Sequence, residues 1–455
     1  MVSGKIIKLF ILFLIIPMLF QCKGKEEYIR LLTFKGSQVG RSLDFYPGFH
    51  PLDSLGYGNV VIRNGDGILA NDFYFSVRRD LPDTLHFHQL DSLMYINGNL
   101  SGISISENTP PPLFFHQLSA KEISHLRTIQ FERPIGDSVK PYLKKIAVLN
   151  PVVDIIYSSE VDSIAILNRD LLWLSQYFHP RALLIENETD SNSFSTIAGF
   201  SSLETLSISL PVNAKDRFTH LPPLPHLKEL ILFGNDNSTF IDSGFFRKNR
   251  DLEGLAIFYI PDGNIDWASL HQFKNLRHLH INSDGLISHD IYRHHPHLKS
   301  LHLSFHNGGG SISSIFQKNQ LKWLSLYSDD APFLGQNPKV LQNSFPQLEY
   351  LEFENYDSLL DYRNFENFKK LKYLVVYGNV GLDSTLHNMD HLRYLSLSED
   401  FLKDSINVVK LQRALPTTII TPNSGACLGS GWLLLIIPLA GLWFYFLKPN
   451  KPVTQ

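Results

Sequence analysis

Four aromatic side chains recur at wide intervals in the second half of the chain: Trp323, Tyr350, Tyr373 and Tyr394. They are separated by about 21 to 27 residues, a spacing typical of repeat proteins. If equivalent repeats place these rings on neighbouring strands about 4.8 Å apart, the rings form a row that can hold a peptide, a glycan or a partner protein. Tyr and Trp suit such contacts because they bury a large area at low entropic cost.

The same surface would carry Tyr327, Glu352, Glu354 and Tyr377, whose polar groups lie further along the same short segments. We expect Glu352 and Glu354 to be exposed neighbours on one strand. A second interpretation stays open, in which the aromatic rings only pack against one another across a sheet and stabilise it.

Histidine is the other residue type that could do chemistry here. Of the 19 histidines, many fall between residues 271 and 306, and His278, His280 and His302 would share the face of the aromatic row, with His280 opposite His302. Two imidazoles on neighbouring strands can share a metal ion. However, no Cys or carboxylate completes a ligand set by spacing, so we expect no metal and a solvated histidine-rich surface. A pH-sensitive patch is the intermediate hypothesis.

The sequence lacks the common catalytic motifs. It has no Gly-x-Ser-x-Gly, no phosphate-binding loop and no His-Glu-x-x-His, and Gly308-Gly-Gly310 is not followed by Lys-Ser/Thr. A net charge of -3 gives no electrostatic footprint for nucleic acid. We therefore expect a protein that is not an enzyme, has no cofactor and does not bind nucleic acid.

A recurring sequence motif, apolar-x-x-apolar-x-apolar, must position these residues. We call this six-residue motif the phrase. Because side chains alternate along a strand, its second and third apolar residues point to one side and the residues around them to the other. The nine clear copies are Leu203/Leu206/Ile208, Leu227/Leu230/Leu232, Leu252/Leu255/Ile257, Leu276/Leu279/Ile281, Leu298/Leu301/Leu303, Leu321/Leu324/Leu326, Leu348/Leu351/Phe353, Leu371/Leu374/Val376 and Leu392/Leu395/Leu397.

One more apolar residue precedes most copies by six or seven positions. It falls in segments too short and polar to form independent helices, so we expect single turns of helix that return the chain with this residue buried. These residues are Phe246, Leu270, Ile291, Ile315, Leu341, Phe365 and Leu386.

The pattern resembles the leucine-rich repeat family, whose motif is Leu-x-x-Leu-x-Leu-x-x-Asn/Cys-x-Leu. The Asn position is kept in some copies, such as Asn235 and Asn379, and replaced in others. The resemblance covers roughly residues 100 to 397. Its more irregular upstream copies are Leu100/Ile103/Ile105, Leu126/Ile129/Phe131, Leu143/Ile146/Val148, Val161/Ile164/Ile166 and Leu183/Ile185.

The resemblance implies an α/β solenoid shaped as a horseshoe, with one short parallel strand per repeat on the concave side and short helical or irregular returns on the convex side. We assign residues 100–421 to this solenoid and its C-terminal cap, with a last strand in 414–420. Residues 23–99 are expected to form a β-rich cap that covers the open end, with strands at 60–62 and 72–77.

The first 22 residues are typical of an export segment. Lys5 and Lys8 precede an apolar run that is short for a membrane span, and Leu19-Phe-Gln-Cys22 resembles a bacterial lipobox, which implies lipidation of Cys22. An uncleaved signal anchor and cleavage elsewhere are the alternatives. In each case the residues beyond 22 lie outside the cytoplasm.

The C-terminal end predicts a second attachment. Residues 427–447 are almost wholly apolar and long enough to span a membrane, residues 422–430 would be a tether, and Lys448 and Lys451 place the tail 448–455 in the cytoplasm. The alternative is a C-terminal sorting signal that is cut and exchanged. The only cysteines, Cys22 and Cys427, adjoin these segments, so no disulfide is expected in the body.

Together these features predict a non-enzymatic, membrane-anchored leucine-rich repeat protein of the cell envelope that binds a protein or glycan ligand on its concave face. Two alternatives stay open. One is a structural scaffold without a discrete ligand site, and the other is a hydrolase with its site in residues 23–99.

Overall fold

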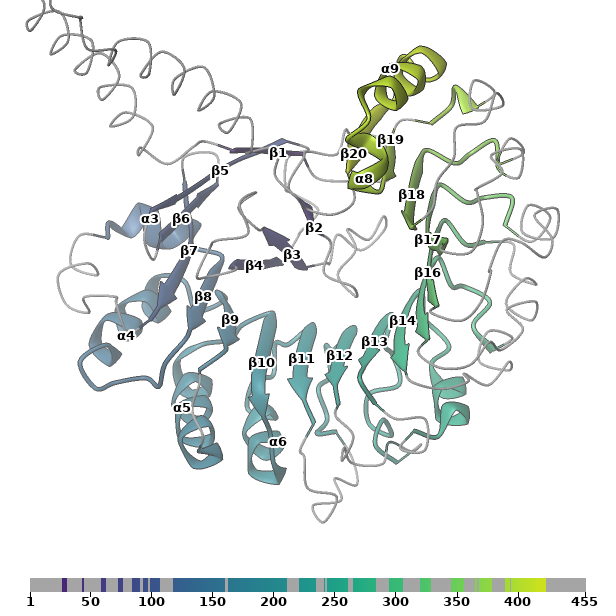
Figure 1. The fold of residues 1–455 in the computed structure, drawn as a ribbon. Helices are drawn as coiled ribbons and strands as arrows, with labels where there is room; N and C mark the ends of the chain where they lie inside the picture. The colour runs from purple at the N-terminus through teal and green to yellow at the C-terminus, as the bar shows by residue number, and fades with distance from the viewer. Residues whose placement is uncertain are drawn as a thin grey trace, which may run out of the picture.

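The fold is an arch whose inner side is lined by a long sheet (Figure 1). The computed structural model describes residues 27–30, 43–44, 59–62, 73–76, 84–90, 93–96, 99–106, 118–159, 163–210, 221–234, 241, 244–260, 265–283, 294–305, 320–328, 345–355, 365, 368–378, 389–392 and 394–422.

The strands of the arch follow one another in chain order, and each pairs in parallel with the next. The sheet does not close on itself, so the predicted solenoid is confirmed. These strands are β7 (Asn99–Ile105), β8 (Thr128–Phe131), β9 (Asp154–Tyr157), β10 (Ala182–Glu188), β11 (Thr205–Ser209), β12 (Glu229–Phe233), β13 (Gly254–Phe258), β14 (His278–Ser283), β15 (Ser300–Phe305), β16 (Trp323–Ser328), β17 (Tyr350–Asn355), β18 (Tyr373–Gly378), β19 (Tyr394–Leu397) and β20 (Ile419–Pro422).

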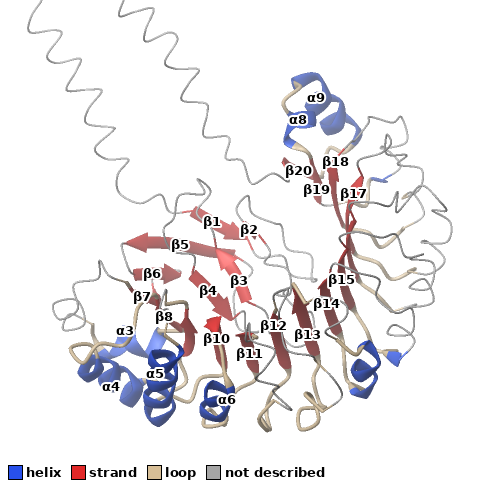
Figure 2. Ribbon diagram, turned by 60° about the horizontal axis from the view of Figure 1, so that its bottom comes forward, coloured by secondary structure: helices blue, strands red, loops and turns tan. Residues whose placement is uncertain are grey.

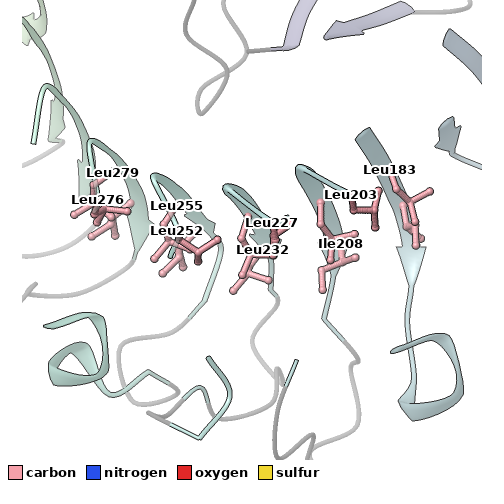
Figure 3. Packing of buried hydrophobic residues seen from close by; sticks show 14 of the residues in the cluster. Leu183, Leu203, Ile208, Leu227, Leu232, Leu252, Leu255, Leu276 and Leu279 are labelled. Carbon is pink, nitrogen blue, oxygen red and sulfur yellow. The ribbon is translucent and has the colours of Figure 1, made fainter. Parts of the chain in front are cut away.

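The repeated phrase sets the strand register. Leu230, Leu255, Leu279 and Leu301 pair in one row across β12 to β15, as the phrase predicts. Each is at most 2% exposed, and Figure 3 shows Leu255 and Leu279 at matching positions on neighbouring strands. Burying one Leu side chain contributes about 1.5–3 kcal/mol, so the row is a main source of stability.

The returning segments bury the residues expected of them where they are described. Phe246, Leu270 and Phe365 have no exposed surface, and Leu270 lies in the 3₁₀ helix η2 (Trp267–Gln272). The sequence interpretation missed a second buried position, three residues before the first Leu of each phrase. It is occupied by Phe200, Leu224, Phe273, Phe345, Phe368 and Met389.

Among the described residues, two repeats replace this apolar residue by a polar one, and both replacements form hydrogen bonds. The amide of Asn249 donates to the carbonyl of Pro222 at 2.9 Å, and its Oδ1 accepts from the backbone N–H of Leu224 at 2.9 Å. His295 Nδ1 lies 3.1 Å from the carbonyl oxygen of Phe273. These contacts join each repeat to the one before it.

Full helices form the outer layer in the first half of the arch (Figure 2). They are α3 (Ala120–His125), α4 (Lys140–Leu149), α5 (Ile164–Tyr177) and α6 (Ser191–Ile197). The prediction that Leu143/Ile146/Val148 and Val161/Ile164/Ile166 are strand phrases was therefore wrong. Leu143 and Ile146 are three residues apart and share the buried side of α4, a spacing that fits a helix as well as the strand phrase.

A buried carboxylate ties α5 to the sheet. Asp170 has no exposed surface, and its Oδ2 accepts from the backbone N–H of Ile135 at 2.7 Å and from the Tyr157 hydroxyl at 2.8 Å. The guanidinium of Arg169 lies 3.0 Å from Oδ1. Burial, together with the charge of Asp170, raises the pKa of the Tyr157 phenol.

The N-terminal strands are antiparallel. β6 (Leu93–Ile96) pairs with β7 and with β5 (Thr84–Leu90), and β1 (Glu27–Arg30) pairs with β5, which covers the edge of the first repeat. A separate sheet contains β2 (Leu43–Asp44), β3 (Asn59–Ile62) and β4 (Phe73–Ser76), so strands lie at both expected positions. β4 lies near β8, and Figures 1 and 2 place β3 and β4 inside the arch.

The C-terminal cap differs from the predicted strand over 414–420. Residue Ala414 ends α9 (Ser405–Ala414), which follows α8 (Glu399–Leu402), and only β20 continues the sheet. The Asp404 carboxylate starts α9 by accepting from the backbone N–H of Ile406 at 2.9 Å. Leu411 and Leu415 close the core beneath it.

Candidate functional site

The strand register brings the four aromatic residues of the sequence pattern side by side. Trp323 pairs with Tyr350, Tyr350 with Tyr373, and Tyr373 with Tyr394, across β16 to β19. The side chains of Tyr327, Glu354 and Tyr394 lie outside the described set. The candidate site is therefore built from the other residues of β16 to β18.

Three of the rings pack together in one cluster, in which Trp323 and Tyr350 are stacked and Tyr373 is tilted against Tyr350. The ring centroids of Trp323 and Tyr350 are 3.6 Å apart with planes at 14°, and those of Tyr350 and Tyr373 are 6.4 Å apart at 36°. Trp323, Tyr350 and Tyr373 are 1%, 3% and 1% exposed, and they pack with Val375. Such contacts add about 0.5–1.5 kcal/mol per aromatic pair to the free energy of burial. The cluster therefore stabilises the sheet.

A polar network lies beside this cluster. Glu352 accepts from the Ser325 hydroxyl at 2.6 Å through Oε2 and from the Tyr377 hydroxyl at 3.1 Å through Oε1. Glu352 is 9% exposed, so the expectation of an exposed Glu352 was wrong, because neighbouring strands enclose its carboxylate. Tyr377 is half-buried and packs against the aromatic cluster. We call Trp323, Tyr350, Tyr373, Tyr377, Ser325 and Glu352 the β16–β18 patch.

The sequence interpretation placed Ser325 on the concave face but did not include it among the candidate site residues. The sequence contained a signal for its role, because Ser325 occupies the same position in the phrase as His302 and Glu352. It pairs with both of these residues on the neighbouring strands. Its hydroxyl donates to a carboxylate rather than to an imidazole. This hydrogen bond is not the nucleophile–base arrangement that activates a serine.

His280 and His302 also face one another as expected. Their ring centroids are 3.7 Å apart with planes at 11°, and the ring of Phe258 lies 4.4 Å from His280. At 3% and 4% exposure, the two imidazoles are not a solvated surface, and that expectation was wrong for this pair. The two rings cover each other by stacking, and His280 also packs against the ring of Phe258.

The remaining histidines divide between surface and core. His278 is half-buried, His294 and His297 are exposed, and the ring of His294 stacks on His271 with centroids 3.7 Å apart. His295 is buried, and His289 lies outside the described residues. Within the described ranges, no group of three or more His, Cys, Asp or Glu side chains is placed to hold a metal ion.

The buried carboxyl of Glu229 on β12 was not anticipated. Its Oε2 accepts from the Thr205 hydroxyl at 3.1 Å, and its Oε1 is buried with no hydrogen-bond partner among the described residues. Burial raises the pKa of Glu229 to about 7, and the charges of Glu253 and Glu204 act in the same direction. A Cβ added at Gly254 would lie 3.1 Å from its Cγ, so a larger residue there would crowd this side chain.

Glu229 predicts a pH dependence of stability. An unfolded chain releases this proton near pH 4.5, whereas the folded chain keeps it until about pH 7, so the free energy of unfolding falls as pH rises between these values. Glu229→Gln removes the titration and is expected to stabilise the protein by up to about 3 kcal/mol at pH 8, with little effect at pH 4. Urea unfolding at both values measures it.

The matched control for this substitution is Glu253→Gln, immediately before the neighbouring strand β13. Glu253 is 20% exposed and pairs with Arg277 at 3.7 Å, so its removal is expected to change stability by less than about 1 kcal/mol. Equal gains for Glu229→Gln at pH 4 and pH 8 would contradict the titration.

The predicted membrane segments are not part of the described structure. Residues 1–22 with Cys22, 427–447 and 448–455 all lie outside it. Among the helices that are described, none is both long and apolar enough to cross a membrane.

The strand register and the repeated phrase together define the fold class of this molecule: it is a solenoid with the architecture of leucine-rich repeats. No protein-family model matches the sequence, and no curated protein matches it.

The chain is also similar, at low identity, to solved structures of leucine-rich repeat proteins. An internalin (inlF) from Listeria monocytogenes has 14% identity and a TM-score of 0.38, over 66% of this chain and 81% of that one. A leucine-rich repeat protein from Leptospira interrogans has 12% identity and a TM-score of 0.33, over 67% and 92%. TLR13, solved in a complex with ssRNA13, has 16% identity and a TM-score of 0.31, and this chain covers 57% of its length.

Proposed function

We propose that this protein is a non-enzymatic binding protein of the cell envelope, held at the membrane, that recognises a protein or glycan through the concave face of its repeats. Repeat solenoids offer extended surfaces for such contacts, although the fold alone names no ligand. The contact region in this proposal is the β16–β18 patch.

One observation carries the proposal: an aromatic cluster adjoins a hydrogen-bonded Tyr377–Glu352–Ser325 network on the same three strands. Aromatic rings combined with a few fixed polar groups are typical of recognition sites. Because Trp323, Tyr350 and Tyr373 are already buried, we assign direct ligand contact to the half-buried Tyr377 and give the three rings a supporting role.

Attachment to the envelope rests on the sequence. The export segment with Cys22 as the proposed lipidation site and the apolar segment 427–447 would hold the repeats outside the cytoplasm, with residues 448–455 inside. A sorting signal in place of the C-terminal span would still leave the repeats outside.

A structural scaffold is the second candidate, and the burial of the aromatic rings favours it. Rings that are at most 3% exposed stabilise the sheet whether or not a ligand exists. The hydrolase hypothesis concerns residues 23–99, and it remains a hypothesis without a described site.

Tyr377→Ala separates recognition from scaffolding. With the full chain immobilised, we expect this substitution to weaken binding to glycan arrays or to extracted envelope proteins by about 30-fold, equivalent to about 2 kcal/mol. The melting temperature is measured in parallel, since a half-buried Tyr contributes modestly to stability.

Tyr259→Ala is the matched control, because Tyr259 is an aromatic side chain 59% exposed just after β13, outside the patch. We expect it to leave binding unchanged. If both variants bind like the parent protein, or if neither they nor the parent binds any array component, the scaffold interpretation replaces the binding one.

A further inference from the structure

The C-terminal cap helix α9 presents an apolar surface that the repeat core does not use. Its buried side chain is Leu411, which joins the core, whereas Ile406 and Val409 are 61% and 44% exposed. These two residues are three positions apart, so they share one face of the helix. Figure 2 shows α8 and α9 at the C-terminal end of the arch.

Two cations follow this apolar pair on the helix. Lys410 and Arg413 are exposed and lie four and seven positions after Ile406, which places them on the same side of α9. The nearest described acidic side chain on this helix, Asp404, is engaged as the N-cap. An exposed helix face that combines apolar residues with cations is the pattern of helices that lie at a membrane surface.

The chain that follows limits how far α9 can be from a membrane. β20 ends at Pro422, and the apolar segment begins at residue 427, so the connection spans about 18 Å at most when fully extended. If 427–447 is inserted in a bilayer, the C-terminal end of the arch must therefore lie close to the lipid headgroups.

We propose that α9 rests on the membrane surface, with Ile406 and Val409 at the headgroup boundary and Lys410 and Arg413 against anionic lipid headgroups. This inference rests on the proposed membrane attachment and deepens it by naming the face that meets the lipid. Such a contact fixes the orientation of the arch relative to the plane of the membrane.

The test uses the full chain with Cys22→Ser and Cys427→Ser, carrying Ile406→Cys labelled with an environment-sensitive dye. The protein is reconstituted into phosphatidylcholine vesicles with or without phosphatidylglycerol, some containing nitroxide-labelled lipid. Flotation first establishes whether the chain is attached. We then expect the dye at position 406 to be quenched at least about threefold in the anionic vesicles.

Val148→Cys is the matched control, because Val148 is also an exposed apolar side chain, 83% exposed, but on α4 in the first half of the arch. A dye there is expected to stay unquenched. Lys410→Glu combined with Arg413→Glu is expected to abolish the extra quenching that phosphatidylglycerol produces, since both charges then repel the lipid.

The outcomes separate the two proposals. A chain that floats while the dye at position 406 behaves like the one at 148 overturns the α9 contact and leaves attachment standing. A chain that does not float overturns attachment through residues 427–447 and the α9 contact with it. Equal quenching with and without phosphatidylglycerol overturns the anionic headgroup assignment.

Discussion

Leu279→Asp is expected to abolish the cooperative folding of the central repeats. Leu279 is 2% exposed and lies between Leu255 and Leu301 in the buried row, so a carboxylate there has no water and no partner in that row. We expect a loss of at least about 4–5 kcal/mol, since an unpaired buried charge is among the most destabilising of single changes. Leu279→Ala is expected to cost about 2–5 kcal/mol.

The effect should extend beyond one repeat. Each repeat contacts only its neighbours, so disrupting β14 removes support from β13 and β15 together. Hydrogen exchange measured by mass spectrometry is expected to show lost protection centred on these strands, with the ends of the arch protected longest. Urea unfolding supplies the free energy.

Leu172→Asp is the control, because Leu172 is 54% exposed on α5. Its expected effect is within about 0.5 kcal/mol. Similar urea midpoints for the two Asp variants would show that the buried row does not carry the stability of the arch.

Asp170→Ala is expected to have the second largest effect. The substitution leaves the backbone N–H of Ile135 and the hydroxyl of Tyr157 without their buried acceptor. Each unsatisfied group costs about 1–3 kcal/mol, so we expect a loss of about 3–5 kcal/mol in the free energy of unfolding. Asp170→Asn keeps one acceptor oxygen and should lose less.

A double-mutant cycle with Tyr157→Phe tests the cause. Once the hydroxyl is absent, Asp170→Ala should cost about 1–2 kcal/mol less, because one partner no longer needs the carboxylate. Asp137→Ala is the surface control, since the Asp137 side chain is 94% exposed beside Lys140. Strict additivity in the cycle would rule out the coupling between Tyr157 and Asp170.

The histidines and acidic residues of the concave side illustrate the limit of sequence reasoning. The phrase correctly placed His280 opposite His302 and Glu352 on the strand next to Ser325. It did not reveal that these side chains are nearly solvent-free, or that Glu229 is a buried acid with a raised pKa. Register follows from the local pattern, whereas exposure depends on everything packed around a residue.

The sequence by itself determined the repeat, the strand positions from residue 203 onward and the row of buried leucines, because strand alternation is a local property that a few residues specify. Tertiary structure decided the rest. Whether Leu143 and Ile146 belonged to a strand or a helix, and whether Trp323 and Glu352 met solvent, depended on stacking between segments far apart in the chain. Burial is a property of the assembled sheet, and no single repeat contains it.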